Sequence, residues 1–150
     1  MATNTILQSL NTSAEGAGTG SSARRQIETY IASGAIAAGD LVAFDVTKTN
    51  DSDKCLHIVK ANSTANETVV AVGFALDAAL AAGDPVQVTV AGLHESANVH
   101  ADTVTGARLI ASSVAGRAAL FTGAESIPVI AYAIEADTAN VAGVIVIKQF

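Results

Sequence analysis

The residues best suited to chemistry gather in one short stretch, GLHESANVHAD, which contains His94, Glu95, His100 and Asp102. A zinc site needs two or three ligands that converge on one point, commonly at helical i, i+4 or turn spacing. The stretch is polar and predicts a loop, its spacing matches no strong metal pattern, and His57 lies far away in the sequence. We expect no metal and no cofactor. A small β-barrel enzyme, or an enzyme subunit, that uses the His94–Asp102 loop stays open as an alternative.

Other chemical motifs are weak. No serine lies in a G-x-S-x-G elbow, and the glycines form neither GxxxxGK nor GxGxxG. Cys55 is the single cysteine, so no intrachain disulfide can form, which fits a reducing cytoplasm. Strand alternation in KCLHIVK favours a buried, inert thiol over a nucleophile. The sequence therefore indicates no enzyme class.

The composition limits the partners. The chain has 150 residues and a net charge of −6, which argues against nucleic acid and against an anionic membrane surface. Half of the residues are hydrophobic, but only 4% are aromatic, so we expect a thin core of alanine and valine that gains stability from partner subunits. The start, MATNTILQSLNTS, does not resemble a signal peptide, and no apolar run is long enough to span a bilayer.

Residues 1–25 differ from the remainder because NTSAEGAGTGSSARR offers little to bury. We expect an extended or flexible arm that becomes ordered against a neighbour, and a tail without a role is the alternative. Five residues of this arm are candidates for contact with a partner: Ile6, Leu7, Leu10, Arg24 and Arg25.

From Gln26 onward, short β-rich runs follow one another, each bounded by Gly, Asp, Asn, Ser or Pro. The runs are QIETYIA, LVAFDVT, CLHIVKA, TVVAVGFAL, PVQVTVAG, ARLIAS, RAALF, IPVIAYAIEA and VAGVIVIKQF. Their regular spacing predicts an all-β fold, a small β-barrel or β-sandwich.

Two near-copies, AIAAGDLVAF and ALAAGDPVQV, mark structural turns rather than chemistry. Gly39 and Gly83 can adopt positive φ, and Asp40 and Asp84 can accept hydrogen bonds from nearby backbone amides. Pro85 fits the first position of a strand, where its missing N–H does no harm. A catalytic role for the two aspartates would need a base, a metal or a cleft that the sequence does not show.

A second repeat relates VGFALDAA to IAYAIEAD. Phe74 and Tyr132 would point to one face, and Asp77 and Glu135 would lie where each strand leaves the core. The two acids could be a paired-carboxylate site, but equivalent positions at strand ends favour solvated edges. We therefore predict a single β domain over residues 26–150 with an internal repeat.

These residues resemble a known family. The run A-x-AAGDLV-x-F-D, followed by VGFALDAALAAGDPVQV, is similar to the capsid decoration, or cement, proteins of tailed bacteriophages. The C-terminal AYAIEA followed by VIVIKQF is similar to the closing strands of that family. The resemblance covers roughly residues 27 to 150, and its motifs consist of small apolar residues.

The resemblance implies a β-tulip-like domain that forms a homotrimer, binds the major capsid protein on the capsid exterior and stabilises the shell of the virion. Such a protein is made in the host cytoplasm. An arm that clamps across a capsomer boundary suits this role, because many symmetry-related copies strengthen modest contacts. The alternative is a head-fibre or surface β domain that binds host glycans, although few aromatic residues are available for such a site.

Overall fold

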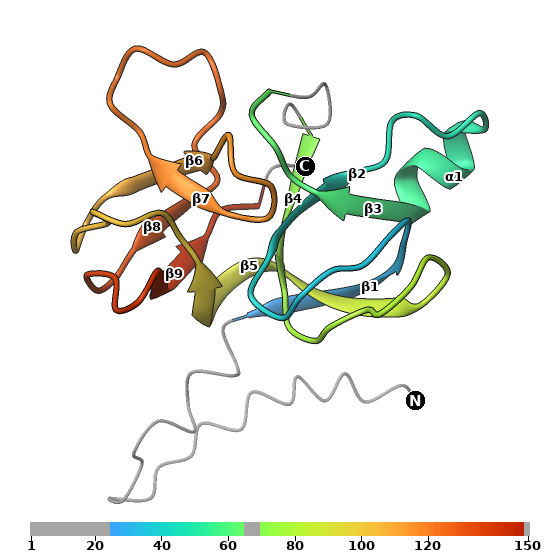
Figure 1. The fold of residues 1–150 in the computed structure, drawn as a ribbon, viewed down its shortest axis with the longest axis horizontal. Helices are drawn as coiled ribbons and strands as arrows, with labels where there is room; N and C mark the ends of the chain where they lie inside the picture. Colours follow the sequence, from blue (N-terminus) through green and yellow to red (C-terminus); the bar gives the residue numbers. More distant parts are fainter. Residues whose placement is uncertain (1–24, 65–69, 149–150) are drawn as a thin grey trace, which may run out of the picture.

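The computed structural model describes residues 25–64 and 70–148, and the all-β prediction is confirmed. Most of the predicted arm lies outside these residues. Nine strands and one short helix make up the described fold (Figure 1). Their bounds are β1 (Gln26–Ala32), β2 (Leu41–Phe44), α1 (Asp51–Leu56), β3 (His57–Lys60), β4 (Ala71–Ala75), β5 (Pro85–Asn98), β6 (Arg108–Ala111), β7 (Ala118–Leu120), β8 (Ala131–Ala133) and β9 (Val141–Val146).

The first half of the described chain is a closed barrel of five strands in the order β1-β3-β2-β4-β5, because β1 also pairs with β5. The β1–β3 pair is parallel and the other pairs are antiparallel. In the second half, β5 continues into a sheet of order β5-β9-β8-β6-β7. β5 is 14 residues long and belongs to both sheets, so no linker separates the two halves (Figure 1).

The pairing registers show that the second half repeats the plan of the first. Leu41 of β2 lies opposite Phe74 of β4, and Arg108 of β6 lies opposite Tyr132 of β8. Both halves also contain a glycine at positive φ just before the equivalent strand, Gly39 at 83° and Gly106 at 81°. The amide of each glycine donates to the carbonyl of the equivalent alanine on the paired strand, at 2.7 and 2.8 Å.

The same correspondence holds where the barrel closes. In the first half β1 runs parallel to β3, with Ala32 opposite Ile58. In the second half the matching contact is a single parallel bridge between Val99 and Ala118. The second half therefore forms a second barrel that is closed by one bridge, where the first is closed by paired strands.

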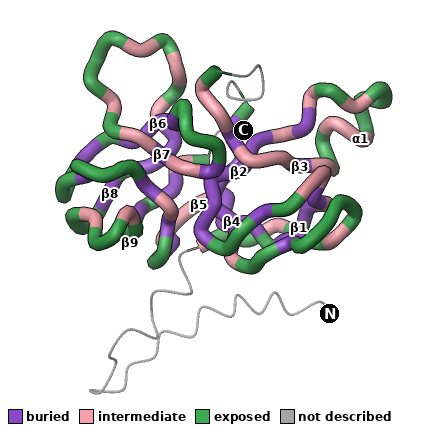
Figure 2. The backbone as a smooth tube through the Cα atoms, viewed as in Figure 1, coloured by how far each residue is buried: buried purple, intermediate pink, exposed green. Residues whose placement is uncertain are grey.

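The two cores are filled differently. Inside the first barrel, large side chains fill the space, among them Tyr30, Ile58 and the partly buried Phe44. Small residues take the matching places in the second barrel, where the cluster also contains Leu41 and Phe74 from the outer face of the first half. The first half thus completes the core of the second, as the buried stretches in the middle of Figure 2 reflect.

The structure corrects two local predictions. Cys55 is exposed on α1, and the strand predicted from CLHIVKA begins only at His57. The charges of this helix favour it, because Asp51 and Asp53 lie in its first turn and Lys54 in its last, and Asp51 pairs with Lys54 at 2.9 Å. No helix in the described part of the chain has the length and apolar character needed to cross a bilayer.

The second correction concerns GLHESAN, which was predicted as a polar loop but forms the end of β5. His94 and Ala97 are buried there, and a register shift between them interrupts the alternation that a regular strand would show. Because this end of β5 is polar, it lacks the alternation of apolar and polar residues that predicts a strand.

Candidate functional site: the His94 cleft and the exposed face of the second half

The first Gly-Asp turn holds three strands together. Gly39 has φ +83°, and a Cβ at this position would overlap the carbonyl oxygen of Ser96, so only glycine fits. Asp40 is 5% exposed and accepts hydrogen bonds from the Ala37 amide at 2.8 Å and the Asn98 side chain at 2.9 Å. Lys60 forms an ion pair with the same carboxylate at 3.0 Å. Asp40 therefore connects the turn to β3 and β5.

The second Gly-Asp turn is simpler. Gly83 has φ +96° with open space around it, and Asp84 accepts hydrogen bonds from the amides of Leu80 and Ala81 at 3.0 and 2.9 Å. Pro85 is the first residue of β5. Both aspartates bind backbone amides of the turn that precedes them, which is a structural arrangement.

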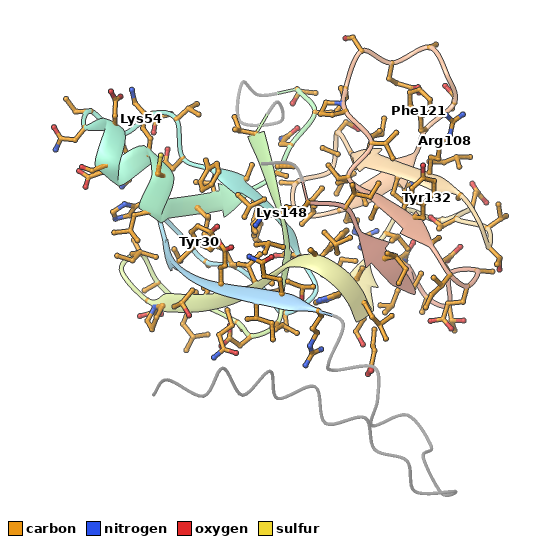
Figure 3. The ribbon with its side chains drawn as sticks, turned by 180° about the vertical axis from the view of Figure 1, so that it is seen from behind. Tyr30, Lys54, Arg108, Phe121, Tyr132 and Lys148 are labelled. Carbon is orange, nitrogen blue, oxygen red and sulfur yellow. The ribbon has the colours of Figure 1, made fainter. Side chains whose placement is uncertain are left out.

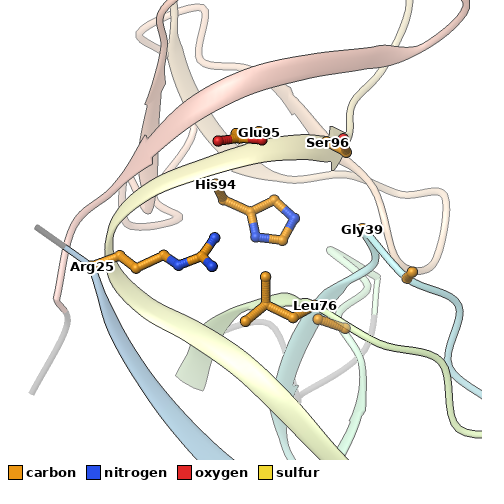
Figure 4. A pocket seen from close by; sticks show the side chains of 8 residues that line it. Arg25, Gly39, Leu76, His94, Glu95 and Ser96 are labelled. Atoms are coloured by element: carbon orange, nitrogen blue, oxygen red, sulfur yellow. The ribbon is translucent and has the colours of Figure 1, made fainter. Parts of the chain in front are cut away.

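A cleft of about 190 Å³ lies beside the first turn (Figure 4). It is lined by Arg25, Ala38, Gly39, Ala75, Leu76, His94, Glu95 and Ser96. Arg25 is the one predicted partner-contact residue that the structure describes, and Ile6, Leu7, Leu10 and Arg24 lie outside the described residues. The cleft brings together segments that are far apart in the sequence, so no local pattern could predict it.

His94 forms the inner wall of this cleft and is 3% exposed. Its ring stacks on Phe74, with 5.5 Å between centroids and 28° between planes, and its Nδ1 lies 3.1 Å from Oγ1 of Thr89. The pKa of His94 is lowered to about 4, chiefly by burial and to a smaller extent by the charge of Arg25, while a hydrogen bond with the Ser96 backbone opposes the shift. At neutral pH the imidazole is therefore uncharged and weakly basic.

The residues proposed for chemistry do not come together. His94 is buried against Phe74, whereas His100 and Asp102 are exposed. Within residues 25–64 and 70–148 there is no group of three His, Cys, Asp or Glu side chains that could hold a metal ion. Asp77 and Glu135 each accept a hydrogen bond from a backbone amide of the neighbouring strand, at 2.8 and 2.7 Å, so each carboxylate supports its own half.

A row of exposed side chains crosses the outer face of the second half. Arg108, Tyr132 and Ile145 are neighbours in register on β6, β8 and β9. Tyr132 is 43% exposed and Ile145 is 39% exposed. The guanidinium of Arg108 also lies 4.7 Å from the ring centre of Phe121. We call these four residues the Tyr132 face (Figure 3). The sequence repeat suggested a shared environment for Tyr132 and Phe74, but Phe74 is fully buried.

Comparisons with known proteins give one kind of match. No protein-family model and no curated protein matches the chain. Among solved structures, the chain is similar to the head fiber gp8.5 N base in bacteriophage phi29, at 19% sequence identity and a TM-score of 0.56. The likeness covers 82% of this chain and 94% of that chain. At this identity the likeness shows that the fold is shared.

Proposed function

We propose that this chain is a structural protein of a bacteriophage virion, held on the outside of the head. The observation that carries the proposal is the extent of the shared fold, which covers 94% of the head fiber base. The functional inference from fold is an analogy. The resemblance of the Gly-Asp and valine-strand motifs to capsid decoration proteins supports the same placement independently.

The use of polar groups in the described residues supports a structural role. Asp40, Asp84, Asp77 and Glu135 all bind backbone amides that define turns or strand ends. His94 is uncharged at neutral pH and packs in the core. These five polar side chains thus stabilise the scaffold.

Two finer roles agree with this placement: a cement protein that stabilises the shell, and the base of a head fibre. In both roles we propose the major capsid protein as the partner and residues 1–25 as the anchor, with Ile6, Leu7, Leu10, Arg24 and Arg25 in contact. Arg25 lies at the root of the anchor, where it lines the His94 cleft.

The experiment compares the full chain with a chain that lacks residues 1–24, so that Arg25 and the cleft remain. Both are mixed with heads that lack the chain, purified from a phage in which its gene is deleted, and are sedimented. We expect the full chain to bind and the shortened chain to stay folded, by circular dichroism, but to remain in the supernatant. Leu80→Glu in the full chain is the control, because Leu80 is 87% exposed in a turn of the first half. Absence of the full chain from purified heads would contradict the virion role, and undiminished binding by the shortened chain would exclude the anchor.

The exposed aromatic group on the Tyr132 face favours one alternative, a surface domain that binds host glycans. Aromatic side chains supply the flat apolar surface that sugar rings pack on, and Tyr132 is 43% exposed. Glycan-array binding by the full chain that is lost in Tyr132→Ala would favour this alternative.

A further inference from the structure

The outer face of the first half shows how one half of this molecule covers the next. Leu41, Phe74 and Thr89 form a row across β2, β4 and β5, and all three are fully buried. The second half covers them: His94 stacks on Phe74, and the carbonyl of Gly116 accepts a hydrogen bond from the Leu41 amide at 2.8 Å.

The Tyr132 face is the counterpart of that row. Register places Arg108 where the first half has Leu41, Tyr132 where it has Phe74, and Ile145 where it has Thr89. Figure 3 shows Arg108, Phe121 and Tyr132 together at one end of the molecule. Among the described residues, the row that is fully buried in the first half is thus partly exposed in the second, with Tyr132 at 43% and Ile145 at 39%.

The surface of the second half that covers this row also has a counterpart, which lies in the first half. His94 pairs with Val144 in the second half, and Glu28 pairs with Val88 in the first. Glu28 therefore occupies in the first half the position that His94 occupies in the second. The amide of Asp45 donates to the His57 carbonyl, and in the second half the amide of Ser112 donates to the Arg117 carbonyl. These two hydrogen bonds are equivalent, so His57 corresponds to Arg117. Leu56, the last residue of α1, therefore corresponds to Gly116. Leu56 is 44% exposed.

The replacements on the two surfaces are complementary. Arg108 is a cation in place of a leucine, whereas β1 and α1 together carry three acids, Glu28, Asp51 and Asp53, against one base, Lys54, which pairs with Asp51. Such pairing of a positive and a negative surface favours one orientation of contact. Figure 3 shows Lys54 of α1 and Tyr132 at opposite ends of the molecule, so a single copy cannot satisfy both surfaces itself.

We propose that copies of this chain associate head to tail, with the Tyr132 face of one copy on the α1–β1 surface of the next, defined by Glu28, Asp51, Asp53 and Leu56. Within one chain, the second half covers the first half. In the proposed contact, the first half of the next copy covers the second half in the same way. Tyr30 and Phe44 already fill the first barrel, so Tyr132 lies across its surface rather than inserting as Phe74 does in the second half. A heterologous contact of this kind closes into a ring or grows as a filament, and the predicted homotrimer is a ring of three copies.

The test measures the mass of the purified full chain by analytical ultracentrifugation from micromolar to submillimolar concentration. We expect concentration-dependent association that Tyr132→Glu and Leu56→Glu each weaken at least tenfold, while Leu80→Glu does not. Melting temperatures and circular dichroism establish that each variant folds, and Arg108→Glu replaces Tyr132→Glu if the latter does not. Added salt should also weaken the association, because opposite charges face each other.

Mixing Tyr132→Glu with Leu56→Glu distinguishes the head-to-tail contact from a two-fold symmetric dimer. Tyr132→Glu retains an intact α1–β1 surface and Leu56→Glu retains an intact Tyr132 face, so the mixture should form a one-to-one heterodimer that neither variant forms alone. Failure of the mixture to pair would overturn the head-to-tail arrangement. A wild-type chain that stays monomeric at every concentration would overturn the proposal, and so would association that neither variant affects. In either case, glycan binding that is lost in Tyr132→Glu would assign the Tyr132 face to a sugar. The outcome is independent of the virion role, since only purified chain is used.

Discussion

Acidification should destabilise this protein through His94. The imidazole is buried between Phe74 and Thr89, and its pKa in the folded state is about 4 against an ordinary value of 6.5. Between pH 4 and pH 6.5, His94 binds a proton in the unfolded chain but not in the folded chain. The stability from neutral His94 is therefore fully present above pH 6.5 and is lost as the pH falls toward 4.

The magnitude follows from the size of the shift. One pKa unit corresponds to about 1.4 kcal/mol, so His94 alone should reduce the free energy of unfolding by about 2 kcal/mol at pH 5 and about 3 kcal/mol at pH 4. Arg25 and Glu95 line the same cleft, and the charge of Arg25 contributes to the shift. Asp45 has a lowered pKa because hydrogen bonds from Ser33 and Thr47 outweigh its burial, so its contribution is lost only as the pH falls below 3.8, which separates the two effects.

The assay is urea unfolding followed by circular dichroism at pH 7.5 and pH 5. His94→Phe retains a ring against Phe74 but cannot take a proton, so its stability should fall by about 2 kcal/mol less than that of the wild type over this interval. His100→Gln, at an exposed position, is the control and should behave as the wild type. Equal pH dependence in His94→Phe and the wild type would refute the reasoning, whatever the absolute stability of the variant.

Three further outcomes can be measured as urea or thermal unfolding. Phe74→Ala should cost about 3–5 kcal/mol because it empties the core of the second half, whereas the equivalent Tyr132→Ala should cost less than about 1 kcal/mol in the monomer, and equal costs would contradict the packing described. Asp40→Ala should cost about 2–3 kcal/mol because it removes a buried carboxylate that accepts hydrogen bonds from the Ala37 amide and the Asn98 side chain, and Asp84→Ala at a less buried turn should cost less; the reverse order would be inconsistent with their burial. Gly83→Val should cost about 1–2 kcal/mol through its positive φ alone, and an unchanged Tm would argue against that strain.

Much of the fold follows from short-range chemistry. The strands from QIETYIA and VAGVIVIKQF form where β-branched runs meet turn residues, and β1 has the predicted bounds Gln26–Ala32. The positive φ at Gly39 and Gly83 follows from the Gly-Asp pairs. Such features depend on a few neighbouring residues, which a sequence displays directly.

The candidate site depends on what covers each strand, and a single sequence does not display this. Phe74 and Tyr132 are equivalent in the repeat, yet one is buried and the other exposed, because the second half covers the first and nothing in the described chain covers the second. The end of β5 was missed for a related reason: His94 is buried by an aromatic partner on another strand, so a polar residue takes an interior position. Alternation in KCLHIVK predicts a strand at Cys55, but the charged turn DSDK before it forms a helix that includes this residue.

The length of β5 has a consequence for how the molecule can be divided. Its first part closes one barrel and its last part is the first strand of the next, so any cut between the halves removes a strand from one of them. Tandem domains joined by a linker can tilt against each other and can be lost or exchanged one at a time. In this chain the duplicated halves instead share a backbone segment, and they are expected to unfold, turn over and evolve as one unit.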